Sequence, residues 1–188
     1  MKSRPSKFVS IDASTNSLAF CLFVFGKIEL VGKINFDGQD IYQKCIDASK
    51  KVQAFFKDPL FNNTEHLIIE HTVFMNSPKT AADLALVQGA IIGAAGVVGI
   101  RSIGRVSPIT WQNYLGNKRL TKEEQLVLRQ QNPGKSDSWY KGFERDYRKK
   151  RTIKLIDILY DKTINDYDVA DACGIGHWAL NNWEKAFA

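Results

Sequence analysis

The chain has 188 residues and is 44% hydrophobic, enough for one substantial core and short for two, so we expect a single domain over residues 1–188. Lys and Arg number 26 against 20 Asp and Glu, a net charge of +6 that favours an anionic partner, nucleic acid or acidic lipid, or serves only solubility. The three cysteines lack metal-ligand spacing and no run of about 20 apolar residues occurs, so we expect a cytoplasmic protein without a membrane span.

The first half of the chain predicts four strands and one helix. Apolar runs predict strands at residues 8–12, 18–25 and 27–36, separated by short turns, so an antiparallel meander opens the fold. Apolar residues at helical spacing predict a helix over 41–56. Residues 66–70 then predict a short strand that ends in an acid.

The second half of the chain predicts one more strand among helices. Pro78 begins a helix rich in Ala and Gly, whose small side chains permit close approach of another helix. We expect the remaining elements to be a strand over 103–106, a capping-box helix from Thr121 to Asn132, a polar loop over 134–151, and helices over 152–160 and 168–187. This order predicts an α/β fold with a mixed sheet flanked by helices.

Four carboxylates stand at the ends of these elements. Asp12 ends the first strand and Glu70 the fourth, while Asp168 and Asp171 lie three residues apart on one face of the last helix. If the first and fourth strands are neighbours, all four carboxylates can converge. Such a cluster repels itself and calls for a cation, and its oxygen ligands suit Mg²⁺ or Mn²⁺ better than Zn²⁺. Two such ions, roughly 3.5–4 Å apart, support phosphodiester hydrolysis.

Each acid also has an ordinary structural interpretation. Asp12 can form a strand-end turn, Glu70 can be a solvated strand end, and a helix dipole favours acids such as Asp168 and Asp171 at its N-terminus. Asp171 fits this interpretation least well, because the alanines on either side of it predict burial. Taken together, the four acids favour a metal site.

Three motifs in this order resemble the RuvC family of Holliday junction resolvases. FVSIDASTNSLAFCLF resembles the first motif, LIIEHTVFMNSPKTAADLALVQGAI the second, and DYDVADACGIGHWAL the third, with its DxxDA pattern. The motifs span nearly the whole chain. The resemblance implies a ribonuclease H-like fold with a mixed five-stranded sheet, and two Mg²⁺ ions per active site, with Mn²⁺ as a possible substitute. The implied metal ligands and catalytic acids are Asp12, Glu70, Asp168 and Asp171.

The resemblance also implies a homodimer that cuts two strands symmetrically at a four-way junction. The candidate seam is the helix after Glu70, with Ala81, Ala82, Ala85, Gly89 and Gly93, and the alternative is a helix buried within the monomer. Divergence from the bacterial pattern suits a virus or phage, in which case the expected location is the host-cell cytoplasm.

A basic segment over 139–154 is interleaved with aromatic residues, a combination suited to branched DNA because cations neutralise phosphates and aromatic rings stack on exposed bases. By resemblance, Lys150 lies near the scissile phosphate and is a catalytic residue. Phe74 is a candidate junction-stacking aromatic, with a core role as the alternative. The residues predicted to bind nucleic acid are Phe74, Lys118, Arg119, Arg148, Lys149, Lys150 and Arg151, against the alternative of a solvated helix face for most of them.

The expected function is that of a Mg²⁺-dependent, structure-selective endodeoxyribonuclease that resolves Holliday junctions and other branched DNA. Two alternatives stay open. One is a catalytically silent protein that binds branched DNA on the same fold, and the other is a ribonuclease H-like enzyme acting on RNA–DNA hybrids.

Overall fold

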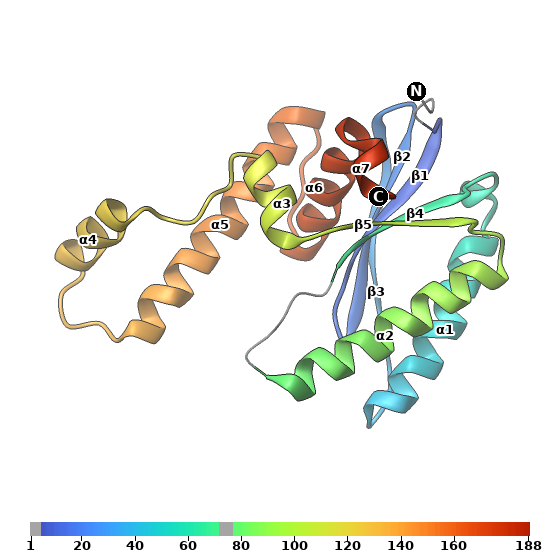
Figure 1. The fold of residues 1–188 in the computed structure, drawn as a ribbon, viewed down its shortest axis with the longest axis horizontal. Coiled ribbons are helices and arrows are strands. Elements are labelled where there is room, and N and C mark those ends of the chain that lie inside the picture. Colours follow the sequence, from blue (N-terminus) through green and yellow to red (C-terminus); the bar gives the residue numbers. More distant parts are fainter. Residues whose placement is uncertain (1–4, 72–76) are drawn as a thin grey trace.

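The computed structural model describes residues 5–71 and 77–188 and is built on a single five-stranded sheet (Figure 1). In spatial order the strands are β3 (Lys27–Asn35), β2 (Ser17–Val24), β1 (Lys7–Ala13), β4 (His66–Glu70) and β5 (Ser102–Val106). β1, β2 and β3 form the predicted antiparallel meander, and β4 and β5 join β1 in parallel. The predicted mixed five-stranded α/β fold is therefore confirmed.

Helices cover both faces of the sheet, as Figure 1 shows. One face packs against α1 (Ile41–Lys57) and α2 (Pro78–Val97), and the other against α6 (Tyr167–Asn181). Side chains of β1 alternate between these layers, because successive residues of a strand point to opposite faces. Val9 and Ile11 lie in the α1/α2 core, whereas Phe8 lies in the α6 core.

Helix α6 approaches the sheet closely because its inward face is made of small residues. The hydroxyl of Ser10 in β1 donates to the carbonyl of Ala172 at 2.7 Å. A Cβ added at Gly176 would overlap the ring of Phe23 and the hydroxyl of Ser10, and one added at Gly174 would lie 2.7 Å from the ring of Trp111. The small residues thus set how near the start of α6 lies to the ends of the strands.

Helix α2 has one buried side and one exposed side. Val87, Ile91 and Ala94 are buried toward the core, while Leu86 and Val97 are exposed. By length and composition α2 could also cross a membrane, with a mean hydropathy of 1.5 and 22% of that window buried. A single helix of this kind is weak evidence of a membrane protein, because core helices of other proteins meet the same criterion.

The region after β5 departs most from prediction. The expected loop over 134–151 is wrong, because α5 (Asp137–Tyr160) is one continuous helix capped by the Ser136 side chain. Residues 118–151, hereafter the α4–α5 arm, project from the body with α4 (Lys122–Gln131), whose predicted capping box at Thr121 is present (Figure 1). A projecting helix buries few side chains, and the apolar residues of this one are interspersed with many charged residues, so its sequence resembles a polar loop.

Three short helices were not predicted as separate elements. They are the 3-10 turn η1 (Pro59–Phe61), α3 (Pro108–Tyr114) and α7 (Trp183–Ala186). α6 ends at Asn181, and α7 follows as a separate short helix where one continuous helix to residue 187 was expected. Of the three, α3 matters most for the site, because it carries Trp111.

We expect Gly176→Ala to lower the free energy of unfolding by about 1–3 kcal/mol, the usual cost of overpacking a core, because the new methyl group must displace Phe23 or Ser10. Urea denaturation measures the change. The matched control is Gly142→Ala in α5, where an added Cβ meets nothing within 4 Å and stability should stay level or rise by up to about 1 kcal/mol. Equal behaviour of the two variants would contradict close packing of α6.

Candidate metal and nucleic-acid site

The four predicted carboxylates lie at one end of the central strands of the sheet. β1 and β4 are parallel neighbours with Ile11 opposite Ile69, so Asp12 and Glu70 follow at the same end. The N-terminus of α6 supplies the other two acids. The Asp166 side chain caps this helix by accepting from the amides of Asp168, at 2.8 Å, and Val169, at 3.1 Å. The first and fourth strands are thus neighbours, which is the condition for the four carboxylates to converge.

The carboxylates act on one another electrostatically. Burial raises the pKa of Asp12 well above its ordinary value, and the charges of Glu70, Asp171 and Asp168 raise it further. Burial likewise raises the pKa of Asp171 to about 7, with Glu70 and Asp168 adding to the effect and Lys149 opposing it. Asp12 and Asp171 therefore resist ionisation where they stand, and a cation would relieve the repulsion.

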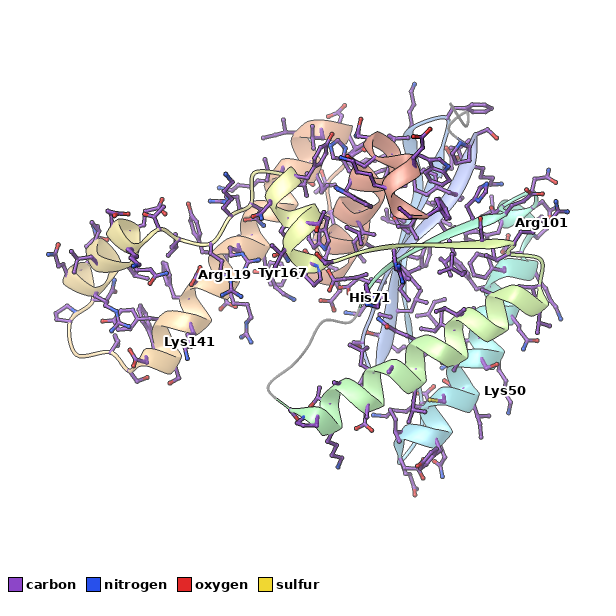
Figure 2. The ribbon with its side chains drawn as sticks, viewed as in Figure 1. Lys50, His71, Arg101, Arg119, Lys141 and Tyr167 are labelled. Carbon is purple, nitrogen blue, oxygen red and sulfur yellow. The ribbon has the colours of Figure 1, made fainter. Side chains whose placement is uncertain are left out.

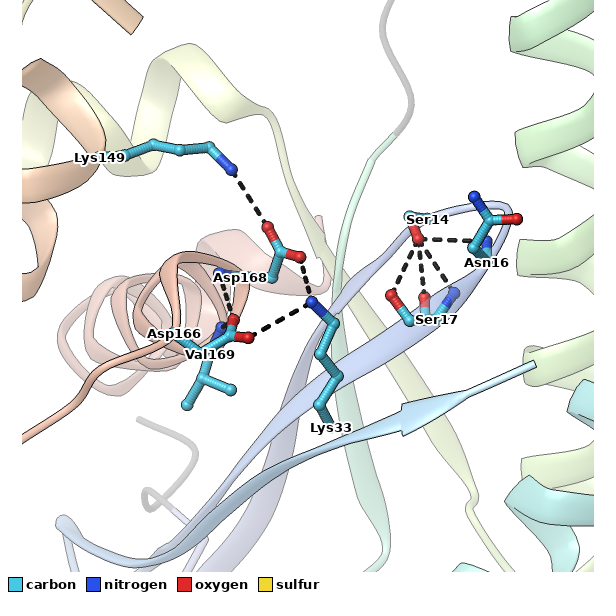
Figure 3. Close-up of polar contacts among 8 residues, drawn as sticks. All are labelled: Ser14, Asn16, Ser17, Lys33, Lys149, Asp166, Asp168 and Val169. Carbon is cyan, nitrogen blue, oxygen red and sulfur yellow. Dashed lines mark hydrogen bonds and ion pairs between the residues drawn. The ribbon is translucent and has the colours of Figure 1, made fainter. Parts of the chain in front are cut away.

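Asp168 differs from its neighbours because two lysines hold it (Figure 3). The Lys33 ammonium lies 2.5 Å from one Asp168 oxygen and 3.5 Å from Asp166, and the Lys149 ammonium lies 3.1 Å from the other Asp168 oxygen. Burial raises the pKa of Asp168, but the bonds from Lys33 and Lys149 outweigh it and leave the pKa below its ordinary value. Of the four carboxylates, Asp168 is thus the one that the lysines hold in its ionised form.

Lys33 reaches the site through strand register. Ala19 of β2 pairs with Asp12 on one side and with Lys33 of β3 on the other, so the three side chains share one face of the sheet. Ala19 is small and fully buried, which leaves room for α6 above it. Sequence analysis missed Lys33, because only the register of the meander places it in line with Asp12.

Trp111 is the second residue that sequence analysis did not place in the site. Its indole N–H donates to a Glu70 carboxylate oxygen at 2.5 Å. Burial raises the pKa of Glu70, and this hydrogen bond opposes the rise. The Gln88 side chain of α2 donates to the Glu70 carbonyl at 3.0 Å, so both the backbone and the carboxylate of this residue are held.

The donor set fits a hard divalent cation. Within the described ranges, no three or more His, Cys, Asp or Glu side chains are gathered into a metal-holding group as they stand. Asp168 is bonded to Lys33 and Lys149, and Glu70 to Trp111. All four predicted donors are nonetheless carboxylates whose charges act on one another, which is the chemistry that Mg²⁺ and Mn²⁺ prefer.

The predicted nucleic-acid-binding residues fall into different settings. Lys149 contacts the carboxylates directly, while Lys150, the predicted catalytic lysine, is exposed on α5. Arg151 bonds the Asn117 side chain and the carbonyls of Gly116 and Lys118, so its guanidinium holds the loop before α4.

The other three predicted positions differ as well. Arg148 is partly buried and donates to the Gln112 side chain. Lys118 and Arg119 are exposed at the base of the arm, where Figure 2 labels Arg119. Phe74 lies outside the described residues.

Positive charge is concentrated in the α4–α5 arm. Residues 118–151 contain 11 Lys and Arg against 5 Asp and Glu, whereas the rest of the chain contains 15 of each. The whole net charge of +6 therefore resides in the arm. Figure 2 shows Arg119 and Lys141 on this projecting part of the molecule, at a distance from the exposed cations of α1 such as Lys50.

Comparison with solved structures identifies the fold. RuvC of Thermus thermophilus in complex with a Holliday junction substrate matches with a TM-score of 0.64 and 13% identity, over 97% of this chain and 99% of that one. A second structure of Thermus thermophilus RuvC matches with a TM-score of 0.63 and 14% identity, over 96% of this chain and 97% of that one. The chain has the fold of RuvC, as its motifs implied.

A more distant match carries less weight. The yeast mitochondrial Holliday junction resolvase Ydc2 aligns with a TM-score of 0.48 and 13% identity, over 97% of this chain and 82% of that one, a score that by itself does not establish a shared fold. No protein-family model matches the sequence, and no curated protein matches it.

We expect Asp171→Asn to stabilise the protein in chelator at pH 8 by about 1–4 kcal/mol. Folded Asp171 keeps its proton up to about pH 7, whereas an unfolded Asp loses it near pH 4. The folded state thus binds more protons between these values, so the free energy of unfolding falls as pH rises from about 4 to 7 and stays low above. The side-chain amide of the Asp171→Asn variant cannot ionise, so the free energy of unfolding of the variant falls less over this pH range.

Urea denaturation at pH 5 and pH 8 measures this difference. The control is Asp146→Asn, which removes an exposed carboxylate on α5 and should not change the difference between the two pH values. An Asp171→Asn protein no more stable than the wild type at pH 8 would show that the Asp171 carboxylate is not destabilised by its surroundings.

Proposed function

We propose that this protein is a metal-dependent endonuclease that resolves Holliday junctions and other branched DNA by paired phosphodiester hydrolysis. The observation that carries the proposal is the placement of four carboxylates, whose charges act on one another, at one end of the central strands of a RuvC-type sheet, where Lys149 of the basic helix α5 contacts Asp168. The RuvC structure with a Holliday junction substrate supports the choice of DNA substrate.

The carboxylates Asp12, Glu70, Asp168 and Asp171 would hold the metal. When bound, Mg²⁺ or Mn²⁺ supplies Lewis-acid activation of water and neutralises charge on the phosphate, with two ions expected per site. The protein's own part is orientation: Trp111 fixes the Glu70 carboxylate, and Lys33 and Lys149 fix Asp168. Asp12 and Asp171 are only partly exposed, which limits the water that would weaken their electrostatic interactions.

Arm cations are suited to the DNA backbone. Lys149 lies at the boundary between the carboxylates and the arm, and Lys150 and Arg148 neighbour it on α5. In this proposal Lys150 contacts the phosphate near the cleaved bond, and Lys118, Arg119 and Arg148 neutralise flanking phosphates.

The proposal is tested by cleavage of an end-labelled four-way junction, with linear duplex and RNA–DNA hybrid beside it, in Mg²⁺ and in chelator. We expect paired symmetric nicks that need metal. Asp12→Asn should lower the rate about a thousand-fold or more, because roughly 4 kcal/mol of charge stabilisation is lost, while junction binding is retained.

Two other outcomes would redirect the assignment. Tight junction binding without cutting in Mg²⁺ or Mn²⁺ would favour a silent binding protein, and preferential cleavage of the hybrid would favour a ribonuclease. Near-normal turnover by Asp12→Asn would contradict the role given to the carboxylates.

Paired cutting requires two active sites, and the exposed side of α2 supports a homodimer formed there. Ala82, Ala85, Gly89 and Gly93 are exposed, and a Cβ added at either glycine meets nothing within 4 Å. The alternative of a helix buried within the monomer applies only to its other side, with Val87 and Ile91. Small exposed residues along a helix suit close packing of a second helix.

We expect Ala85→Arg to convert a dimer to a monomer and to abolish paired nicks, because the charged side chain would enter a seam made of small residues. Light scattering after size-exclusion chromatography measures the mass. The matched control is Leu126→Arg, an exposed site on α4 that should leave the mass unchanged. A wild-type protein that is a strict monomer would contradict the dimer.

A further inference from the structure

Three aromatic rings form a ladder along the arm portion of α5. Trp139, Phe143 and Tyr147 follow one another at a spacing of four residues, which aligns them on one face of the helix. The Trp139 and Phe143 rings lie 5.5 Å apart at 26°, and the Phe143 and Tyr147 rings lie 6.4 Å apart at 6°. Phe143 and Tyr147 are 41% and 45% exposed, so part of this aromatic ladder is accessible to solvent.

An apolar groove lies between the ladder and α4. Its walls include Phe143 and Tyr147 on one side and Leu120, Val127 and Leu128 on the other, around a hollow of about 360 Å³. That volume is within the range of small-ligand sites, roughly 300–1,000 Å³. Large apolar side chains left open in this way indicate a surface that a partner covers.

Charge points to nucleic acid as the occupant. Both ends of the ladder are flanked by cations, with Lys135 at 5.6 Å from the Trp139 ring and Arg151 at 5.6 Å from the Tyr147 ring. The arm also carries the entire net positive charge of the chain. A partner that offers both flat aromatic groups and negative charge fits these features, and nucleic acid offers both.

A second hollow, beside the apolar groove, offers a place for phosphates that is separate from the place for bases. It measures about 600 Å³ and shares Leu120 and Leu128 with the first groove, so the two adjoin. Five cations outnumber two acids in its lining, which includes Arg119, Arg129, Lys141, Arg145 and Arg148 together with Asp137 and Glu144. The Arg148 Nε is buried and has no hydrogen-bond partner among the described residues.

The apolar groove itself is unsuited to phosphate. Glu123 and Glu124 line it, and Glu124 is held there by a 2.7 Å bond from the Thr121 amide. Negative charge at the rim repels phosphates but admits neutral bases. Bases therefore fit the groove, and the backbone fits the arginine-lined hollow.

We propose that the α4–α5 arm binds unpaired nucleotides beside the branch of its DNA substrate, stacking their bases on the aromatic ladder. Paired bases already stack on each other inside a duplex and cannot reach the groove, so the site selects single-stranded DNA. The inference rests on the proposed DNA substrate and specifies it as branched DNA with a single-stranded segment at the branch. The ladder ends two residues before Lys149, about 3 Å along the helix axis, so the bound strand leads toward the carboxylates.

The test compares binding of two labelled junctions, one fully paired and one with a single-stranded gap at the branch. Wild-type protein should bind the gapped junction more tightly. The double variant Phe143→Leu/Tyr147→Leu keeps apolar bulk and helix propensity but removes two π faces, and should lose about tenfold or more in affinity for the gapped junction alone. The matched control is Phe25→Leu, an aromatic residue 81% exposed in the β2–β3 turn, which should bind as the wild type does.

A direct readout of stacking accompanies the affinities. A 2-aminopurine base placed in the gap should lose fluorescence on binding the wild type and should keep it with the double variant. Equal affinity of the wild type for both junctions, equal loss on both by the double variant, or an unquenched probe would each overturn the inference.

Metal-dependent cleavage of the fully paired junction is measured in parallel, and it separates this inference from the proposed nuclease. A protein that selects the gap but does not cut would overturn the nuclease and leave the arm's role standing. A protein that cuts paired junctions normally but shows no preference for the gap would overturn the arm's role and leave the nuclease standing.

Discussion

The close approach of α6 to the sheet is the constraint on which the rest of the molecule depends. Gly176 allows that approach, and the Ser10 hydroxyl binds the Ala172 carbonyl across it, while Gly174 lets Trp111 of α3 pack closely against the same helix. The same approach partly buries Asp12 and Asp171, and this burial raises the pKa of both. Packing of the core and ionisation of the site therefore oppose one another, and the stability of the sheet and its apolar layers must offset the unfavourable electrostatics at its edge.

Local patterns were enough to predict most of the fold. Alternation and apolar runs gave all five strands, with β4 matching in full, because strands of a sheet covered on both faces carry a strong hydrophobic signal. The same reasoning failed for the first half of α5, where aromatic residues recur at four-residue spacing but are outnumbered by polar and charged residues, so the segment resembles a polar loop. α3 was missed because its seven residues are too few to show a period.

The candidate site was predictable only from acids that stand at the ends of predicted strands and helices. Acids at two strand ends and one helix start pointed to Asp12, Glu70, Asp168 and Asp171, and β1–β4 pairing brings their elements together. Lys33 depends on the register of three strands, which no local pattern encodes. That Lys149 and not Lys150 contacts Asp168 depends on helical phase, which the expected loop up to residue 151 does not provide.

Under the proposed function, the uneven distribution of charge has a consequence for how the molecule would approach DNA. Because residues 118–151 hold the entire excess of cations and the rest of the chain is balanced, the protein is a strong electric dipole. The field of a polyanion turns such a body during diffusion, so the arm arrives first and the acidic sheet edge faces the backbone only afterwards. In this proposal the counterions released on binding come from contacts of the arm, so the salt sensitivity of association would belong to the arm and not to the carboxylate site.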